Sequence, residues 1–143
     1  MTLQDITMIR TYQGTIYPWN CDHMGHMNVQ FYVAKFDQAT WNLMALLGLT
    51  SEYFEKEKKG CVALEQHIKY FKEVAAGDNI FVESEIIEIK DKIILFNHYM
   101  IELTGEEIVS ETNLTGLHMD TKLRKACSLP KFVKENYKRL IQQ

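Results

Sequence analysis

The sequence predicts an α+β protein in which one antiparallel β-sheet is wrapped around one long central α-helix. Two observations support this. Helical periodicity is strong over one long stretch and two short ones, and the other patterned segments are strands joined by short turns. Burying the helix on the concave face of such a sheet gives a two-layer domain. The chain has 143 residues, 46% hydrophobic and 24% charged, so we expect residues 1–143 to form a single domain.

The N-terminal third is predicted to contain a strand, a polar loop and the long helix. Met8–Tyr17 is rich in Thr, Tyr and Ile, which favours a strand. The polar segment 19–28 contains a glycine and directly precedes the helical pattern. From Val29 to Leu47, apolar residues recur at intervals of three and four, which predicts a helix of about five turns, roughly 28 Å long. Asn28 is the candidate N-cap and Gly48 the candidate stop.

The rest of the chain is rich in β-strand patterns up to about residue 121. A short helical segment is expected over 51–58, and a terminal helix after Pro130. Short separators containing Gly or Asp predict antiparallel hairpins between successive strands. In the last strand neither alternating face is purely apolar, so one face is expected to be solvated or to lie at a subunit contact. The strand candidates are Cys61–Phe71, Asn79–Lys90, Lys92–Leu103 and Glu107–Asp120.

Composition excludes several classes of protein. The net charge of −3 lacks the basic excess of a nucleic-acid binder. Three widely spaced cysteines without a CxxC pair favour neither a disulfide framework nor a thiolate zinc site, and reduced cysteines point to the cytoplasm. Met1–Arg10 has no leader-like pattern, and no apolar run is long enough to span a membrane. We therefore expect a cytoplasmic protein without nucleic-acid or membrane partners.

The most distinctive segment is Cys-Asp-His-Met-Gly-His-Met-Asn at 21–28. With Glu-Gln-His-Ile-Lys-Tyr at 65–70 and Ala-Gly-Asp at 76–78, it resembles the 4-hydroxybenzoyl-CoA thioesterase-like branch of the hotdog fold. In that branch an Asp-x-x-Gly loop, often continued as His-x-Asn, leads into the central helix. A Tyr and an acidic residue are common where this chain has Tyr32 and Asp37. The resemblance covers nearly the whole chain.

This resemblance implies a hotdog fold and hydrolysis of an acyl-CoA thioester, with coenzyme A as part of the substrate and no separate cofactor. It also implies a homodimer or homotetramer in which two subunits join their sheets edge to edge. The active sites would then lie at the subunit interface. A sheet with uncovered edges predicts self-association for the same physical reason.

Thioester hydrolysis needs an activated water or nucleophile and a site for the negative charge on the carbonyl oxygen. Asp22 is the candidate catalytic residue, either attacking the carbonyl to form an anhydride or taking a proton from water. The unpaired amides and dipole of a helix N-terminus supply the second requirement, and alignment with the motif makes the Val29 amide the candidate oxyanion donor. Considered alone, Asp22 would be interpreted as a turn or capping residue.

The neighbours of Asp22 have both structural and functional interpretations. Gly25 is a turn glycine that also lets the backbone pass close to substrate. His26 either orients Asp22, water or the thioester carbonyl, or is a hydrogen-bonded loop residue. For Asn28 the capping role is favoured over substrate binding. Related acyl-carrier-protein thioesterases use a loop resembling Asp-x-Asn-x-His, whereas this chain has Met24 at the Asn position, so it departs from a full Asp-Asn-His assembly.

Further candidates rank lower. Glu65 and His67 share one face of a predicted strand, where they either line a substrate channel or face water. Asp37 is expected to make a structural polar contact. Cys21 as a nucleophile ranks below the adjacent carboxylate. A metal site built from the Cys, Asp and His residues of the 21–26 loop is disfavoured because no second ligand cluster is evident, so no metal is expected.

Two other functions compete with hydrolysis. A non-catalytic acyl-CoA-binding hotdog protein would keep the groove and be indifferent to Asp22. A hotdog dehydratase pairs a catalytic His with a helix acid, or uses an Asp-x-Asn-Pro-x-His loop, and neither pattern is present. The sequence leaves open the acyl group, the choice between CoA and acyl-carrier-protein thioesters, dimer against tetramer, and the contacts to the CoA phosphates.

Overall fold

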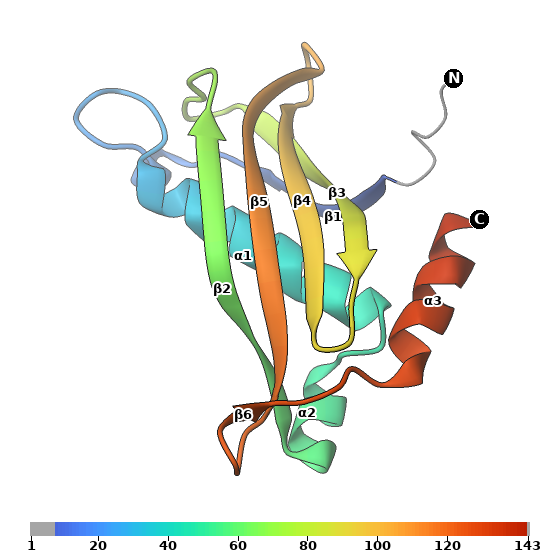
Figure 1. Cartoon of the computed structure of the whole chain (residues 1–143). Helices are drawn as coiled ribbons and strands as arrows, with labels where there is room; N and C mark the ends of the chain where they lie inside the picture. The colour runs from blue at the N-terminus through green and yellow to red at the C-terminus, as the bar shows by residue number, and fades with distance from the viewer. Residues whose placement is uncertain (1–7, 143) are drawn as a thin grey trace.

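The structure is a computed structural model that describes residues 8–142. A curved antiparallel sheet wraps around α1 (Val29–Leu46), as Figure 1 shows. The 18 residues of α1 span about 27 Å and end within one residue of the predicted boundary. Asn28 is the N-cap, and its side-chain oxygen accepts a hydrogen bond from the Gln30 amide. Gly48 follows the helix at φ +95°, a conformation that glycine adopts without strain.

The strands form one sheet in the order β1-β3-β4-β5-β2, with β6 paired to the end of β5. All pairs are antiparallel, and β3-β4 and β4-β5 are the predicted hairpins. This sheet around one central helix is the hotdog fold expected from the sequence. The strands are β1 (Ile9–Thr15), β2 (Lys59–Tyr70), β3 (Asn79–Ile89), β4 (Ile93–Glu102), β5 (Glu107–Asp120) and β6 (Lys125–Ala126).

One predicted pairing is wrong: β2 and β3 do not form a hairpin. β2 pairs with β5 at one end of the sheet order, and β3 pairs with β1 near the other end. The connection 71–78 joins the two regions and is held by the loop before α1 and by the end of β1. Val74 is buried and its carbonyl accepts from the Met27 amide at 2.7 Å, while Gly77 donates to the Ile16 carbonyl at 2.8 Å. A turn signal alone does not show which strands it joins.

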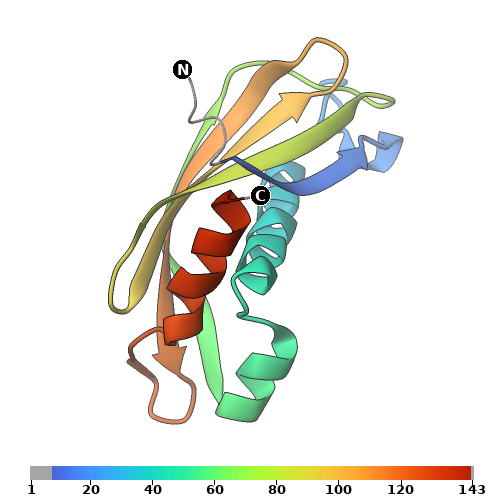
Figure 2. The same cartoon turned by 90° about the vertical axis from the view of Figure 1, so that its right-hand side faces the viewer.

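Three short helices complete the described chain: η2 (Pro18–Asn20), α2 (Ser51–Glu57) and α3 (Lys131–Ile141). Figure 2 shows α3 lying beside α1 on the concave side of the sheet. Val133 of α3 is fully buried, and the Asn136 amide donates to the Leu47 carbonyl at 2.9 Å. Within residues 8–142 no helix is both long and apolar enough to cross a bilayer. Residues 1–7, part of the segment used to argue against a leader, lie outside the described residues.

The core lies between the concave face of the sheet and α1. One buried cluster surrounds the N-terminal half of the helix and includes Phe36 and Met100. A second surrounds the C-terminal half and brings in Phe96 and Val133. This burial is the main driving force that holds the helix in the sheet.

A row of buried polar side chains crosses this core. Thr11 and Ser84 are 2.7 Å apart, the Ser84 hydroxyl lies 2.6 Å from His98 Nδ1, and His98 Nε2 lies 2.8 Å from the Thr40 hydroxyl. Burial lowers the pKa of His98 to about 3, so its ring is neutral at pH 7. Because Thr40 donates to the Phe36 carbonyl, it accepts from Nε2–H, and Nδ1 therefore accepts from Ser84. The row thus joins β1, β3 and β4 to α1.

Candidate active site

The loop before α1 is a small closed hairpin. An isolated antiparallel bridge joins Cys21 to Met27, and the Asn28 amide donates to the Asn20 carbonyl at 2.9 Å. Between them, Gly25 has φ +88° and donates to the Asp22 carbonyl at 3.0 Å. Nothing lies within 4 Å of a β-carbon built at this glycine, so the loop needs Gly25 for its backbone conformation and not for space.

The Asp22 carboxylate is held by two hydrogen bonds, one from its own loop and one from the N-cap of α1. Its Oδ1 accepts from the Met24 amide at 2.9 Å, and its Oδ2 accepts from Asn28 Nδ2 at 2.7 Å. The hydrogen bond from Asn28, followed by that from the Met24 amide, holds the pKa of this carboxyl below its usual value. Asp22 is therefore fully ionised at pH 7. Asp22 thus stabilises the turn through the Met24 amide and is also bonded to the N-cap of α1, so the structural and functional interpretations are compatible.

The backbone donors of the first helical turn differ in availability. The Gln30 amide is bound by the Asn28 side chain at 3.1 Å, and the Phe31 amide by the Asn28 carbonyl at 3.0 Å. Within residues 8–142 the Val29 amide has no protein acceptor. It is the unpaired donor at the positive end of the helix dipole, where a substrate carbonyl oxygen would gain most from it.

His26 lies in the same loop, and its carbonyl accepts from the Asp22 amide at 3.2 Å, but within residues 8–142 its ring makes no hydrogen bond to the Asp22 carboxylate. Its Nε2 lies 3.7 Å from Glu73 Oε1, and its Nδ1 lies 3.4 Å from the Met27 carbonyl. Together with Tyr32 and Tyr70, His26 lines a shallow cavity beside the loop. The contact between His26 and Glu73 joins the loop to the 71–78 connection that follows β2.

Glu65 and His67 lie elsewhere. Both are exposed on β2, where a bulge between Ala63 and Glu65 shifts the pairing with β5. They line a separate hollow with Asn97 and Asn113. The structure therefore brings Asp22, Gly25, His26, Asn28 and Val29 together within one chain, and does not bring Glu65 or His67 to them.

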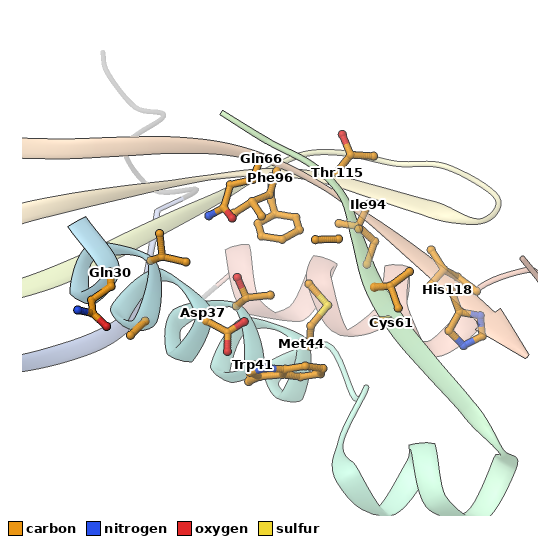
Figure 3. Close-up of a pocket in the computed structure, with 18 residues that line it drawn as sticks. Gln30, Asp37, Trp41, Met44, Cys61, Gln66, Ile94, Phe96, Thr115 and His118 are labelled. Carbon is orange, nitrogen blue, oxygen red and sulfur yellow. The ribbon is translucent and has the colours of Figure 1, made fainter. Parts of the chain in front are cut away.

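A cavity of about 350 Å³ lies between α1 and the sheet, on the side of β2 (Figure 3). One stripe of α1 forms its floor, including Gln30 at the first turn, Asp37 and Trp41. Sequence reasoning missed it. Asp37 was expected to make a structural polar contact, yet it has no hydrogen bond or ion pair within residues 8–142 and lines the cavity. The spacing of polar and small residues along one helix stripe was the available signal.

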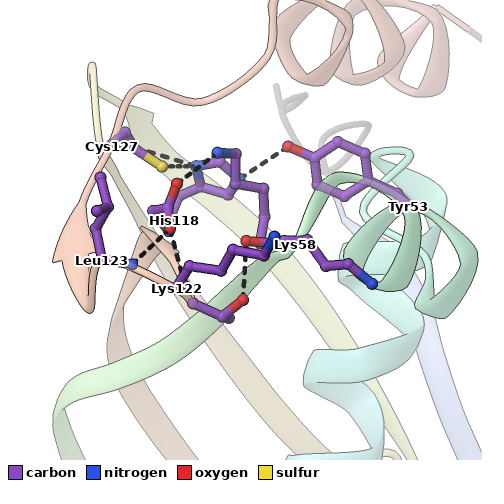
Figure 4. A network of polar contacts seen from close by, with 9 residues as sticks. Tyr53, Lys58, His118, Lys122, Leu123 and Cys127 are labelled. Carbon is purple, nitrogen blue, oxygen red and sulfur yellow. Dashed lines mark hydrogen bonds and ion pairs between the residues drawn. The ribbon is translucent and has the colours of Figure 1, made fainter.

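The far end of the cavity is closed by a polar network (Figure 4). His118 is buried, with Nε2 3.0 Å from the Tyr53 hydroxyl and Nδ1 3.1 Å from the Cys127 carbonyl. Burial lowers the pKa of His118, so the ring is neutral at pH 7. Beside it, burial raises the pKa of the Cys61 thiol to about 12, which keeps this cysteine protonated and a poor nucleophile.

The described residues contain no group of three or more His, Cys, Asp or Glu side chains arranged to hold a metal ion. Cys21, in the loop, donates weakly to the Tyr17 carbonyl at 3.8 Å. Asp22 is the carboxylate of the motif, and it is hydrogen-bonded to the residue that caps α1.

A model of the thioesterase-like superfamily matches residues 16–137, which include the Asp22 loop, α1 and β2 to β5. The chain belongs to the thioesterase-like superfamily. The match covers most of the chain and confirms the family inferred from the motif.

Two relatives of this thioesterase-like chain carry informative names. It is 30% identical over 98 residues to a betainyl-CoA thioesterase of Pseudomonas aeruginosa, covering 68% of this chain and 61% of that protein. It is 28% identical over 109 residues to an L-carnitine dehydrogenase/betainyl-CoA thioesterase of Agrobacterium fabrum, covering 76% of this chain and 22% of that protein. The chain thus spans less than two thirds of the length of either relative.

Solved structures support the fold of this thioesterase-like chain. A Staphylococcus aureus hypothetical protein in complex with CoA has a TM-score of 0.87 at 17% identity, covering 94% of this chain and 85% of that one. A Pseudomonas putida putative thioesterase has a TM-score of 0.80 at 24% identity, covering 94% and 86%. A gentisyl-coenzyme A thioesterase has a TM-score of 0.77 at 18% identity, covering 88% and 98%. At these identities the likeness establishes the hotdog fold.

Proposed function

We propose that this protein hydrolyses an acyl-CoA thioester to a carboxylic acid and CoA, with Asp22 as the catalytic carboxylate. The observation that carries the proposal is the hydrogen-bonded unit at the start of α1. The ionised Asp22 is held by Asn28, which caps the same helix, and the Val29 amide next to the cap is free among the described residues. Family membership and the names of the relatives support the same reaction.

In the proposed reaction the thioester oxygen accepts a hydrogen bond from the Val29 amide, which stabilises the oxyanion as the carbonyl carbon is attacked. Asp22 acts in one of two ways. As a general base, it takes a proton from the attacking water, and the tetrahedral intermediate then expels CoA thiolate. As a nucleophile, it forms a mixed anhydride with release of CoA thiolate, and water then cleaves the anhydride. The lowered pKa of Asp22 keeps the carboxylate ionised at pH 7, as both routes require.

Asp22→Asn tests the proposal. We expect kcat/KM for acyl-CoA hydrolysis to fall by about 10²–10⁴-fold because the charge that attacks or accepts a proton is removed. The assay uses short, long and aromatic acyl-CoA thioesters together with betainyl-CoA, for which two relatives are named. Asp91→Asn, in the β3–β4 turn, removes the same charge away from the motif and serves as the control.

The outcomes separate the competing functions. Unchanged turnover of the folded Asp22→Asn variant removes Asp22 from the mechanism. Binding of CoA thioesters by the wild type without turnover of any of them favours the non-catalytic acyl-CoA binder. No observation in the structure favours a dehydratase.

We further propose that the site is completed by a second copy of the chain, in a homodimer or homotetramer. β2 is 12 residues long, and within residues 8–142 it pairs only with β5, which leaves its other edge free. Apolar side chains along it are exposed, including Leu64 at 55%. An exposed apolar edge strand is a template for pairing with another chain. Pairing of two β2 strands would place the partner's β2 beside the cavity, which this chain's own β2 lines with Cys61, Ala63 and Gln66. A cytoplasmic location remains a prediction from the reduced cysteines.

A further inference from the structure

The shallow cavity beside the loop before α1, here the loop cavity, lies at the end of the helix that carries the free amide. Its volume is about 300 Å³, and Val29 lines it together with His26, Tyr32 and Tyr70. On α1, the lining of the larger cavity begins at Gln30 and does not include Val29. A thioester whose carbonyl is bound at the Val29 amide is therefore surrounded by the side chains of the loop cavity.

One amide supplies half of the usual arrangement for an oxyanion, because sites of acyl transfer commonly present two donors to the same oxygen. The next two amides of the helix do not supply the other half. The Gln30 amide is bound by the Asn28 side chain, and the Phe31 amide by the Asn28 carbonyl. The second donor is therefore to be sought among the side chains that line the loop cavity.

Four side chains of the loop cavity can donate hydrogen bonds: His26, Tyr32, Tyr70 and Lys72. The Lys72 ammonium donates to Glu107 Oε1 at 2.9 Å, and the Tyr32 hydroxyl donates to the Lys72 carbonyl at 3.5 Å. The His26 ring faces the Met27 carbonyl with one nitrogen and Glu73 with the other. Of the four, only the Tyr70 hydroxyl has no hydrogen-bond partner within residues 8–142.

Tyr70 is held in place relative to Val29 from two directions. It is the last residue of β2, and its ring makes an edge-to-face contact with Tyr32, near the start of α1, at a centroid distance of 5.1 Å. The connection that follows Tyr70 is bonded to the loop before α1, from the Met27 amide to the Val74 carbonyl at 2.7 Å. The strand and the helix therefore present the hydroxyl and the amide to one cavity in a preorganised arrangement.

The charges around the loop cavity suit a donor of this kind. Burial raises the pKa of Tyr70, so the phenol keeps its proton and is a neutral donor at pH 7. Among the described residues the cavity lining contains one carboxylate, Glu73. The Glu73 side chain is 76% exposed and lies beside His26, so water screens its charge from an oxygen held by Tyr70.

We propose that the Tyr70 hydroxyl is the second donor to the thioester oxygen, paired with the Val29 amide. As Asp22, or the water that it activates, bonds to the carbonyl carbon, the carbonyl π electrons move to the oxygen, and both hydrogen bonds strengthen. Tyr70 keeps its proton, and the electrons return to re-form the carbonyl as the CoA thiolate leaves. This inference rests on the proposed hydrolysis of acyl-CoA thioesters and adds a catalytic residue to it.

Tyr70→Phe removes the hydroxyl and keeps the ring with its contact to Tyr32. We expect kcat for the acyl-CoA panel to fall by about 10–100-fold, while KM changes by less than about threefold, because the lost hydrogen bond is strongest in the transition state. Steady-state kinetics measures both. The control is Tyr99→Phe, which removes a hydroxyl that donates to Glu85 at 2.6 Å on the other face of the sheet.

The kinetic outcomes decide as follows. A loss of kcat in Tyr70→Phe, with wild-type kcat in Tyr99→Phe, supports the inference. An unchanged kcat in folded Tyr70→Phe overturns it and leaves the proposed role of Asp22 intact. A kcat that falls equally in both variants also overturns it, because the loss then follows from removing any hydroxyl of the sheet.

The stretching frequency of the bound thioester carbonyl tests the hydrogen bond without turnover. The probe is the member of the acyl-CoA panel that binds most tightly to Asp22→Asn, with an isotopic label at its thioester carbonyl, and infrared difference spectra are recorded. Adding Tyr70→Phe is expected to raise the frequency, because a carbonyl with one donor fewer is less polarised. Such a rise supports the inference even if the wild type hydrolyses none of the panel. The same frequency in both proteins contradicts it independently of any catalytic result.

Discussion

At the residue scale, Asn28 performs two tasks with the two ends of one amide. Its oxygen caps α1 and its nitrogen donates to Asp22. The sequence favoured capping over a functional role, but the structure shows that capping leaves the nitrogen free to hold the carboxylate. Asn is suited to this position because its amide accepts with one atom and donates with another, whereas an ionised Asp has no donor, and Ser or Thr would have to accept and donate through a single oxygen.

This arrangement predicts the pH dependence of activity. Asn28→Ala removes the hydrogen bond that contributes most to lowering the pKa of Asp22, so that pKa rises toward its ordinary value. Asp22 must be ionised to act, and the acid limb of the kcat/KM profile is therefore expected to move to higher pH. The depressed pKa also means that this hydrogen bond stabilises the fold above the unfolded-state pKa, a contribution lost as pH falls through the lower folded-state value.

The control for Asn28→Ala is Thr50→Ala. Thr50 caps α2 by accepting from the Tyr53 amide at 3.1 Å, and removing either cap is expected to cost about 1 kcal/mol of stability. Only Asn28→Ala should shift the acid limb measured by steady-state kinetics. An equal shift in both variants would show that the effect comes from general destabilisation.

The candidate site was predictable in part at this scale. The motif at 21–28 identified Asp22, the helix start and the loop, because these residues are close in sequence and their geometry is local. Whether Asp22 acts as predicted remains for experiment. Asp37 was not recognised as a cavity residue, because its surroundings come from β2, β4 and β5 and depend on the pairing of distant strands.

At the element scale, the long helix and the main strands were predicted to within a few residues. Their periodicities are properties of each segment alone, and α1 carries both a cap and a stop. The position of β2 was not predictable in the same way, because the order of strands depends on long-range packing. β6 has only two residues and carries no periodic signal.

The junction between α1 and α3 gives a stability prediction. A β-carbon at Gly48 would lie 2.7 Å from the Phe132 ring and 2.8 Å from Asn136 Nδ2. Gly48→Ala is therefore expected to lower the free energy of unfolding by about 2–4 kcal/mol, from backbone strain at positive φ and from overpacking against α3. Chemical denaturation measures this loss.

Gly77→Ala is the matched control. Gly77 has φ +96°, nearly the same as Gly48, but a β-carbon at Gly77 would have nothing within 4 Å of it. Its substitution is expected to cost only the backbone strain of about 1–2 kcal/mol. Equal losses in the two variants would show that α3 does not restrict Gly48.

At the scale of the whole molecule, the free edge of β2 gives an assembly prediction. Leu64→Lys places a charge on that edge, and we expect the dissociation constant of the dimer to rise by about tenfold or more because the charge would be buried on pairing. Sedimentation measures the shift toward the 16.8 kDa monomer. Leu103→Lys, at an exposed position just after β4, is the control. A wild type that sediments as a monomer at all concentrations would refute the proposed assembly.

The buried polar row favours one register of the strands over all others. It consists of Thr11, Ser84, His98 and Thr40. An apolar core tolerates many nearly equivalent packings, whereas hydroxyl and imidazole groups have fixed donors and acceptors that match in one arrangement. If β3 slid along β4 by two residues, apolar side chains would still face inward. The buried His98 ring would, however, lose the hydrogen bond from Ser84, and no water in the core would replace it. The polar row therefore disfavours shifted strand registers that hydrophobic burial alone would tolerate. Because Thr40 belongs to it, the row also fixes the position of α1, and of the loop that precedes α1, along the strands.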